Sequence, residues 1–278
     1  MGAAAMMLAW VLKQSLDGRA AILNALLLQS YSPDLNVRAS YNPVAWSLSC
    51  EMLFYLLFPL LAYGVRRIRP ARLWWWTGGT VALIFLLAAL SGLLPPQQPY
   101  PIVGMTDWQT WLLYQFPPAR LPEFALGILL ARIVLTGQRL PFGLRGATIF
   151  VVVMGALLPL FPGTYRAVAV MVLPLGLLIA ASASNDVAGR RSWLAGRLMV
   201  WLGELSFAFY LWHYLVLDAI HQWLGGRSWD TPEALGVVAL ILAVALALSW
   251  LLYNLVERPM MRRFAAPKRH EVAPGASS

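Results

Sequence analysis

One segment of this sequence, NPVAWSLSCEMLFYLLFPLLAYG at residues 42–64, is almost wholly apolar. Pro43 suits the first turn of a helix, and the run from Val44 to Gly64 contains Glu51 as its single charged residue. A helix rises about 1.5 Å per residue, so about 20 apolar residues cross a hydrocarbon core about 30 Å thick. The segment therefore predicts a membrane-spanning helix that carries one carboxylate into the lipid.

The composition of the whole chain agrees with this prediction. Hydrophobic residues make up 60% of the 278 residues and charged residues 12%, whereas about a quarter of the residues of a soluble domain are charged. These values exclude a soluble globular enzyme, a disordered chain and a fibrous protein. One cysteine, Cys50, excludes an internal disulfide and a CxxC zinc cluster, and with three histidines in the chain we expect no metal site.

The sequence predicts an all-α fold, a polytopic membrane helical bundle with seven full transmembrane helices and a partial one at Met1–Leu12. The seven predicted spans are Val44–Gly64, Leu73–Leu94, Trp111–Leu135, Gly146–Tyr165, Ala167–Asn185, Leu198–His221 and Ala234–Val256.

The remaining segments complete the predicted organisation. Within Lys13–Pro43, the apolar stretch Ile22–Leu28 is too short to span and predicts an interfacial or re-entrant helix. We predict one membrane domain over residues 1–264 and a disordered cytoplasmic tail over residues 265–278.

Basic residues distribute unequally between the loops. Fourteen lie on one side of the predicted bundle and two, Arg166 and Arg227, on the other. Since basic loops stay in the cytoplasm, the C-terminus is predicted to be cytoplasmic, and the net charge of +9 does not indicate a nucleic-acid partner. The fourteen are Arg66, Arg67, Arg69, Arg72, Arg139, Arg145, Arg190, Arg191, Arg197, Arg258, Arg262, Arg263, Lys268 and Arg269.

Three predicted spans carry ionisable groups, although a charge at bilayer depth costs roughly 2.5–3.5 kcal/mol on insertion scales. In the first of them, Ser47, Glu51 and Tyr55 recur every four residues and share one helix face. A carboxylate flanked by hydroxyls can hold and pass a proton. The alternative is a buried structural glutamate that bonds a neighbouring helix.

The second such span contains Arg120 and Glu123 three residues apart, close to Pro117, Pro118 and Pro122. Prolines interrupt helix regularity and free carbonyl groups. An arginine at such a break is suited to binding a phosphate or a carboxylate. The alternative is a structural ion pair.

The third such span places Ser206, Tyr210 and His213 on one face. A neutral imidazole can accept a proton from a hydroxyl, and Tyr210 could orient it. The alternative is a core histidine whose nitrogen is satisfied by a neighbouring carbonyl.

Together these segments resemble acyltransferase family 3, the multi-helix membrane O-acyltransferases of bacteria. The resemblance covers nearly the whole chain and includes four motifs in the same order. The first motif matches at Trp46, Ser47, Leu48, Ser49, Glu51, Phe54, Tyr55, Phe58 and Pro59, the second at Arg120, Glu123, Phe124, Gly127 and Ala131, the third over Leu202–His213 with Phe207 in place of a tyrosine, and the fourth over Asn254–Pro259.

Family members usually have ten helices, and the first supplies an Arg or Lys and a catalytic His. The seven predicted spans correspond to the last seven, so the resemblance implies an N-terminally truncated member that does not transfer acyl groups alone. His213 matches a different family motif and is not the counterpart of that catalytic His.

The resemblance implies transfer of an acyl group, commonly acetyl, from cytoplasmic acyl-CoA to a hydroxyl of a cell-surface glycan or lipid-linked sugar. It also implies the bacterial inner membrane, with lipid as surroundings and no bound cofactor. On this hypothesis Glu51, Ser47 and His213 are catalytic. The candidate binding residues are Trp46, Ser49, Tyr55, Arg120, Glu123, Ser206 and Tyr210. Two alternatives remain: a transporter or flippase, and an inactive scaffold or binding protein.

The predicted topology can be tested by cysteine labelling. Because the loop Pro95–Trp108 should face outward, a Gln98→Cys variant should react in intact cells with a membrane-impermeant thiol reagent. Labelling that requires broken cells would reverse the predicted orientation.

Overall fold

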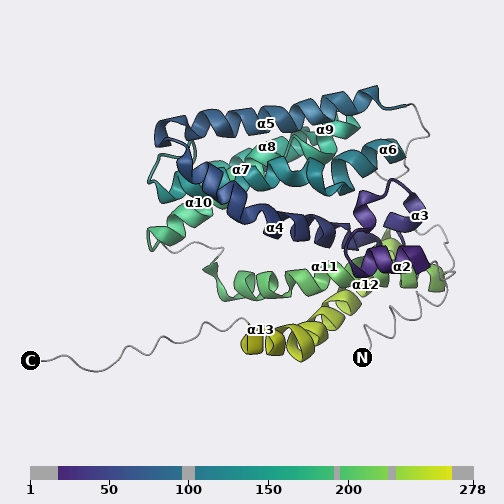
Figure 1. Ribbon diagram of the computed structural model, residues 1–278. Coiled ribbons are helices and arrows are strands. Elements are labelled where there is room, and N and C mark those ends of the chain that lie inside the picture. Colours follow the sequence, from purple (N-terminus) through teal and green to yellow (C-terminus); the bar gives the residue numbers. More distant parts are fainter. Residues whose placement is uncertain (1–17, 96–103, 191–194, 225–229, 265–278) are drawn as a thin grey trace, which may run out of the picture. The chain divides into compact units, whose positions relative to one another are not determined.

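The computed structural model describes residues 18–95, 104–190, 195–224 and 230–264 (Figure 1). The predicted partial helix at Met1–Leu12, the predicted tail at residues 265–278 and Gln98 lie outside these residues. Within the described ranges every regular element is a helix, which confirms the all-α prediction. The elements are α2 (Gly18–Ala25), η1 (Gln29–Tyr31), α3 (Leu35–Arg38), η2 (Pro43–Ala45), α4 (Trp46–Arg67), η3 (Pro70–Arg72), α5 (Leu73–Leu90), η4 (Ser91–Leu93), α6 (Asp107–Gln109), η5 (Thr110–Gln115), α7 (Pro117–Leu135), α8 (Leu144–Leu157), η6 (Leu158–Leu160), α9 (Gly163–Val168), α10 (Val172–Val187), α11 (Arg197–Trp223), α12 (Thr231–Leu252), η8 (Tyr253–Glu257) and α13 (Arg258–Phe264).

Helical stretches long and apolar enough to cross a membrane are present in both halves of the chain. Large apolar side chains point outward from them, as for Trp75, which is 82% exposed, and Leu56, which is 74% exposed. Such surfaces require lipid as their solvent, so the chain is an integral membrane protein. Among the described residues there are five such stretches: Pro43–Arg67, Pro70–Leu93, Gly163–Val187, Arg197–Trp223 and Thr231–Arg263.

The predicted span Trp111–Leu135 is interrupted in the structure. A π-helix, η5, ends at Gln115, Phe116 is extended (φ −74°, ψ 114°), and α7 starts at Pro117. A proline disfavours helical geometry in the residue before it, so Pro117 forces this break. The prediction of one continuous helix was wrong, whereas the predicted loss of regularity near the prolines is confirmed.

The predicted span Gly146–Tyr165 also has different bounds. Helix α8 starts at Leu144, its continuation η6 ends at Leu160, and Tyr165 already belongs to α9. Phe161 is extended (φ −93°, ψ 146°) because Pro162 follows it. Together α8 and η6 are a shorter apolar helix than the five spanning stretches.

The start of α4 follows directly from its sequence. The side-chain oxygen of Asn42 accepts a hydrogen bond from the backbone N–H of Val44 (3.2 Å), and Pro43 occupies the first position of η2. Arg66 and Arg67 in the last turn suit the negative end of the helix dipole. Pro59 lies inside the helix and lacks the N–H that the carbonyl of Tyr55 would otherwise accept.

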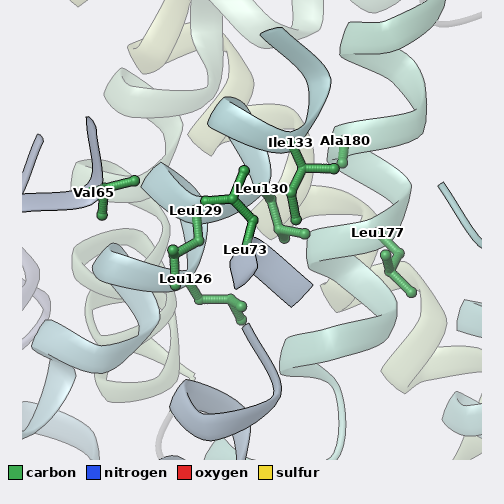
Figure 2. Packing of buried hydrophobic residues seen from close by; sticks show 8 residues of the cluster. All are labelled: Val65, Leu73, Leu126, Leu129, Leu130, Ile133, Leu177 and Ala180. Carbon is green, nitrogen blue, oxygen red and sulfur yellow. The ribbon is translucent and has the colours of Figure 1, made fainter. Parts of the chain in front are cut away.

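The described residues divide into two compact units, one up to Gly196 and one from Arg197 onward. In the first unit α7 is central, because α4, α5 and α10 all pack on it (Figure 1). Figure 2 shows the buried cluster at these contacts, in which Leu73 and Ile133 are completely buried. Helices in lipid associate mainly through such close packing, so this cluster helps to hold α4, α5, α7 and α10 together.

The second unit is a helix pair. Along α11 and α12 the buried side chains Trp212, Leu215, Val216 and Ala245 form one cluster. The chain then passes through the π-helix η8 into α13.

The segment before α4 contains short elements only. Helix α2 covers eight residues, Gly18–Ala25, and includes part of the predicted stretch Ile22–Leu28. It is too short to span, as expected, and its interfacial position stays a prediction.

The contact between α7 and α10 can be tested with two matched glycine variants. A Cβ atom on Gly176 would lie 2.9 Å from Cδ1 of Leu130, whereas nothing lies within 4 Å of one on Gly127. Overpacking costs about 1–3 kcal/mol, so Gly176→Val should lower the melting temperature by about 3–10 °C in detergent. Equal melting of Gly176→Val and Gly127→Val would contradict this packing.

Candidate functional site

Arg120 and Glu123, in the first turns of α7, form an ion pair. Nη1 of Arg120 lies 2.6 Å from Oε1 of Glu123, and the two side chains are 18% and 23% exposed. The i, i+3 spacing in the sequence predicts this contact, and the structure confirms it. An ion pair in these surroundings greatly lowers the cost of placing each charge in an apolar layer.

The π-helix η5 supports the arginine from a second side. Nη1 of Arg120 also donates to the carbonyl of Leu113 (3.5 Å), and its guanidinium lies 5.7 Å from the ring centre of Tyr114. The same ring packs on the indole of Trp46 from α4, with 4.7 Å between ring centres. The ring of Tyr114 in η5 therefore lies between Trp46 of α4 and Arg120 of α7 and links these two helices.

Cys50 of α4 lies where the two helices meet. Its thiol is 3.8 Å from the carbonyl of Gln115, and the residue is 3% exposed. The ion pair of Arg120 and Glu123 contacts the same π-helix, η5, through the carbonyl of Leu113, and Glu51 follows Cys50 directly in the chain. We name Cys50, Glu51, Arg120 and Glu123 the Cys50 cluster. It is the place in the first unit where the predicted polar residues of two motifs come together.

The other predicted residues of α4 have different surroundings. Ser47 donates to the carbonyl of Val44 (3.4 Å), one turn earlier in the chain. Ser49 is fully buried, and its hydroxyl has no partner among the described residues. Tyr55 is 71% exposed on the outside of the helix. The structure therefore does not bring Tyr55 to the cluster, and its role stays a prediction.

Aromatic residues of the first two motifs pack on each other. The rings of Phe54 and Phe124 are stacked, with centres 4.7 Å apart and an angle of 5° between planes. Phe58 lies 6.2 Å from the same ring of Phe124. These rings hold α4 against α7 about one turn after Glu51 in α4 and after Arg120 in α7.

Two grooves flank α7, and Glu123 lies at both. The groove between α4 and α7 has a volume of about 600 Å³, and the groove between α7 and α10 about 320 Å³. The first is lined by Phe58, Ala62, Val65, Arg66, Glu123, Phe124, Gly127, Ile128, Ala131, Arg132, Leu135 and Thr136. The second is lined by Glu123, Leu126, Gly127, Leu130, Ala131, Val134, Val172, Leu175, Gly176, Ile179, Ala180 and Ala183.

Sequence reasoning missed a buried network beside the cluster. Arg38 of α3 is 1% exposed, forms an ion pair with Asp107, and donates to the side-chain oxygen of Gln115 (2.5 Å). Gln115 is also the residue whose carbonyl meets Cys50. The arginine therefore joins the segment before α4 to the end of η5. The available signal was one isolated arginine and one isolated aspartate, both in segments predicted to lie outside the membrane.

In the second unit the predicted residues make contacts within their own helix. Nδ1 of His213 lies 2.6 Å from the carbonyl of Tyr210, and the hydroxyl of Ser206 donates to the carbonyl of Gly203 (2.7 Å). The histidine contact is the one expected of a structural residue. A catalytic role for His213, and its approach to Glu51 and Arg120, stay predictions.

A further polar contact of this unit was also missed. The hydroxyl of Tyr253 donates to Oε2 of Glu204 (2.9 Å) and joins α12 to α11 where η8 begins.

As to metals, the described parts of both units contain no group of three or more His, Cys, Asp or Glu side chains that could hold an ion.

Comparisons with known proteins agree over most of the chain. The sequence profile of acyltransferase family 3, described as an acyltransferase domain, matches residues 3–254. Acyltransferase MdmB of Streptomyces mycarofaciens is 35% identical over 254 residues, which cover 90% of this chain and 65% of that protein. ORF330 of the Acidianus two-tailed virus is 27% identical over 217 residues, which cover 75% of this chain and 54% of that protein. The chain thus spans less than two thirds of the length of either relative. No solved structure matches.

The Arg38 network can be tested by stability measurements. Arg38→Met leaves Asp107 without its partner. We expect a loss of roughly 2–3 kcal/mol, below the 3–5 kcal/mol of a fully buried pair because Asp107 is 33% exposed. The melting temperature in detergent should fall by about 5–10 °C. The control is Arg69→Met at an exposed position of the same unit. Indistinguishable melting of the two variants would rule out an anchoring role.

Proposed function

This chain belongs to acyltransferase family 3, and on that basis we propose that it is a membrane-bound O-acyltransferase. The proposed donor is acyl-CoA on the cytoplasmic side, with acetyl as the simplest acyl group. The proposed acceptor is a hydroxyl of a cell-surface carbohydrate or of a lipid-linked sugar. The product would be an O-acylated surface polysaccharide.

The proposed topology has seven spanning helices in the bacterial inner membrane. Besides the five long apolar stretches, we assign α7 and the pair α8–η6 as spans. Helix α7 has 19 residues and is therefore about 28 Å long, close to the thickness of the hydrocarbon core. The asymmetry of basic loops favours a cytoplasmic C-terminus.

The groove between α4 and α7 is suited to the donor. Arg66 and Arg132 lie at its end near the C-termini of both helices, which this topology places in the cytoplasm. Arginines there could meet the phosphates of CoA. Arg132 lies nine positions after Glu123 in α7, a distance of about 14 Å along the helix. A donor bound by its phosphates would thus extend its thioester toward the Cys50 cluster.

The proposed reaction is a direct acyl transfer. The acceptor oxygen forms a bond to the thioester carbon, and the carbon–sulfur bond breaks. The hydroxyl proton passes to a base, and CoA leaves as a thiolate that takes up a proton. Two groups are required for this: a base near the hydroxyl and a donor to the oxygen on which negative charge develops.

The described residues supply candidates for both tasks. We assign Glu51, with Ser47, to positioning or deprotonating the acceptor, and Arg120 to the developing oxyanion. His213 is the candidate base from the second unit. We assign acceptor or donor binding to Trp46, Ser49, Tyr55, Glu123, Ser206 and Tyr210.

The observation that carries this proposal is the Cys50 cluster itself. Arg120 and Glu123 form an ion pair within apolar helices and contact η5, which also contacts the buried Cys50 beside Glu51 in α4. Charges at such depth are costly and usually mark a functional site. The cluster lies at the end of a groove whose other end carries two arginines.

The central test is a Glu51→Gln substitution at the chromosomal gene. It retains the shape of the side chain and removes its charge. Positioned proton transfer is typically worth about 10²–10⁴ in rate, so turnover should fall by a factor in that range. The measurement is transfer of labelled acetyl from acetyl-CoA to surface carbohydrate in isolated membranes, normalised to the amount of protein.

Glu233→Gln serves as the matched control, since Glu233 is an exposed residue at the start of α12. We expect wild-type transfer from it. Full activity of Glu51→Gln would remove this residue from the mechanism. Label that crosses the membrane without entering a product would support a transporter instead.

A further inference from the structure

The groove between α7 and α10 differs chemically from the groove beside α4. Its lining is apolar apart from Glu123, and it carries no arginine at either end. A sugar or a peptide-like amide placed there would lose hydrogen bonds to water without gaining others. The groove therefore fits a hydrocarbon chain and excludes a polar ligand.

The direction of this groove follows from the contacts of Gly176. The nearest side chains to it are those of Leu130 and Leu126, so this part of α10 lies level with the middle of α7. Val172 lies about one turn before Gly176 in the chain, and Ala183 about two turns after it. Figure 2 shows Ala180, about one turn after Gly176, beside Ile133, which follows Leu130 in α7. Because later residues of α10 meet later residues of α7, the two helices run in the same direction, and Ala183 lies toward the end of the groove that Val134 lines.

Glu123 stands at the near end of the groove. Val134 lies eleven positions after Glu123 in α7, which corresponds to about 16 Å of helix. The volume of about 320 Å³ equals roughly ten water molecules of ~30 Å³ each. Both values exceed what the single methyl of an acetyl group would fill.

The two grooves also meet. Glu123, Gly127 and Ala131 line both of them, and nothing lies within 4 Å of a Cβ atom built on Gly127. A chain that approached the Cys50 cluster along α4 could therefore continue on the other side of α7 without meeting a large side chain.

We propose that the groove between α7 and α10 binds the hydrocarbon chain of the acyl donor and sets the acyl length that the protein transfers. This inference rests on the proposed function, because it requires the thioester to lie near Glu123. Burial of each further methylene strengthens binding of a donor that comes from water. Chains longer than acetyl are accordingly accepted, up to the length at which they reach Ala183.

The first experiment measures the ratio of kcat/KM for octanoyl-CoA to that for acetyl-CoA in native membranes. Ala183→Leu narrows the far end of the groove, so it should lower this ratio at least tenfold. Gly127→Leu narrows the groove nearer to Glu123, so it should also lower the ratio of butyryl to acetyl transfer. The control is Ala82→Leu, the same substitution at an exposed position of α5.

A second experiment does not require turnover. A fatty acyl-CoA with a photoreactive group at the end of its chain is cross-linked in membranes, and the modified residues are mapped by mass spectrometry. We expect labels on residues 179–183 of α10 and on Val134, reduced at least tenfold by Ala183→Leu. Excess unlabelled octanoyl-CoA should compete for the site, whereas a phospholipid of the same chain length should not.

The outcomes separate this inference from the proposed function. Wild-type transfer with equal ratios in Ala183→Leu and Ala82→Leu would overturn the inference and leave the acyltransferase intact, and so would transfer of acetyl alone. Absence of all transfer in membranes that express the chromosomal gene would refute the proposed function, and the cross-linking sites would then decide whether the groove binds an acyl chain. Displacement of the label by phospholipid would identify the occupant as a membrane lipid and overturn the inference.

Discussion

The ion pair between Arg120 and Glu123 is the interaction around which the first unit is organised. A guanidinium cannot remain unpaired in an apolar layer, and α7 supplies the carboxylate only one turn away. The break at Phe116 turns η5 so that a carbonyl and the ring of Tyr114 also face this arginine. The helix break before Pro117 thus gives Arg120 a carbonyl and an aromatic ring as neighbours, which lowers the cost of burying its charge.

Local features of this arrangement could be predicted from the sequence. The spacing of Arg120 and Glu123 predicts their contact, because residues three apart on a helix are neighbours. Pro117 predicts the interruption before α7, although not the π-helix that precedes it. The length of each apolar run predicts a helix, but the interruption at Phe116, the early end of α8 and the turn at residues 169–171 within the predicted span Ala167–Asn185 were missed. These features depend on residues close together in the chain.

The remaining features depend on residues far apart and could not be predicted in this way. Arg38 and Asp107 are 69 residues apart and belong to short elements without periodicity. The stacking of Phe54 on Phe124 explains why aromatic residues occur in two distant motifs, but only the packing of α4 on α7 reveals it. The grooves likewise arise from how three helices are spaced, and no single segment encodes that spacing.

Pro59 has a mechanical consequence for α4. The part of α4 before Pro59 contacts η5 through Trp46 and Tyr114, and α7 through Phe54 and Phe124. Because residue 59 donates no hydrogen bond to the carbonyl of Tyr55, α4 is less stiff in the turn that follows these aromatic contacts. After Pro59 the helix is joined to α7 a second time, because Val65 is buried in the cluster of Figure 2 and Nη2 of Arg132 donates to the carbonyl of Arg66 (2.8 Å). The missing hydrogen bond thus lies between two sets of contacts with α7, so a bend at Pro59 changes the angle between the two halves of α4 without detaching either half from α7.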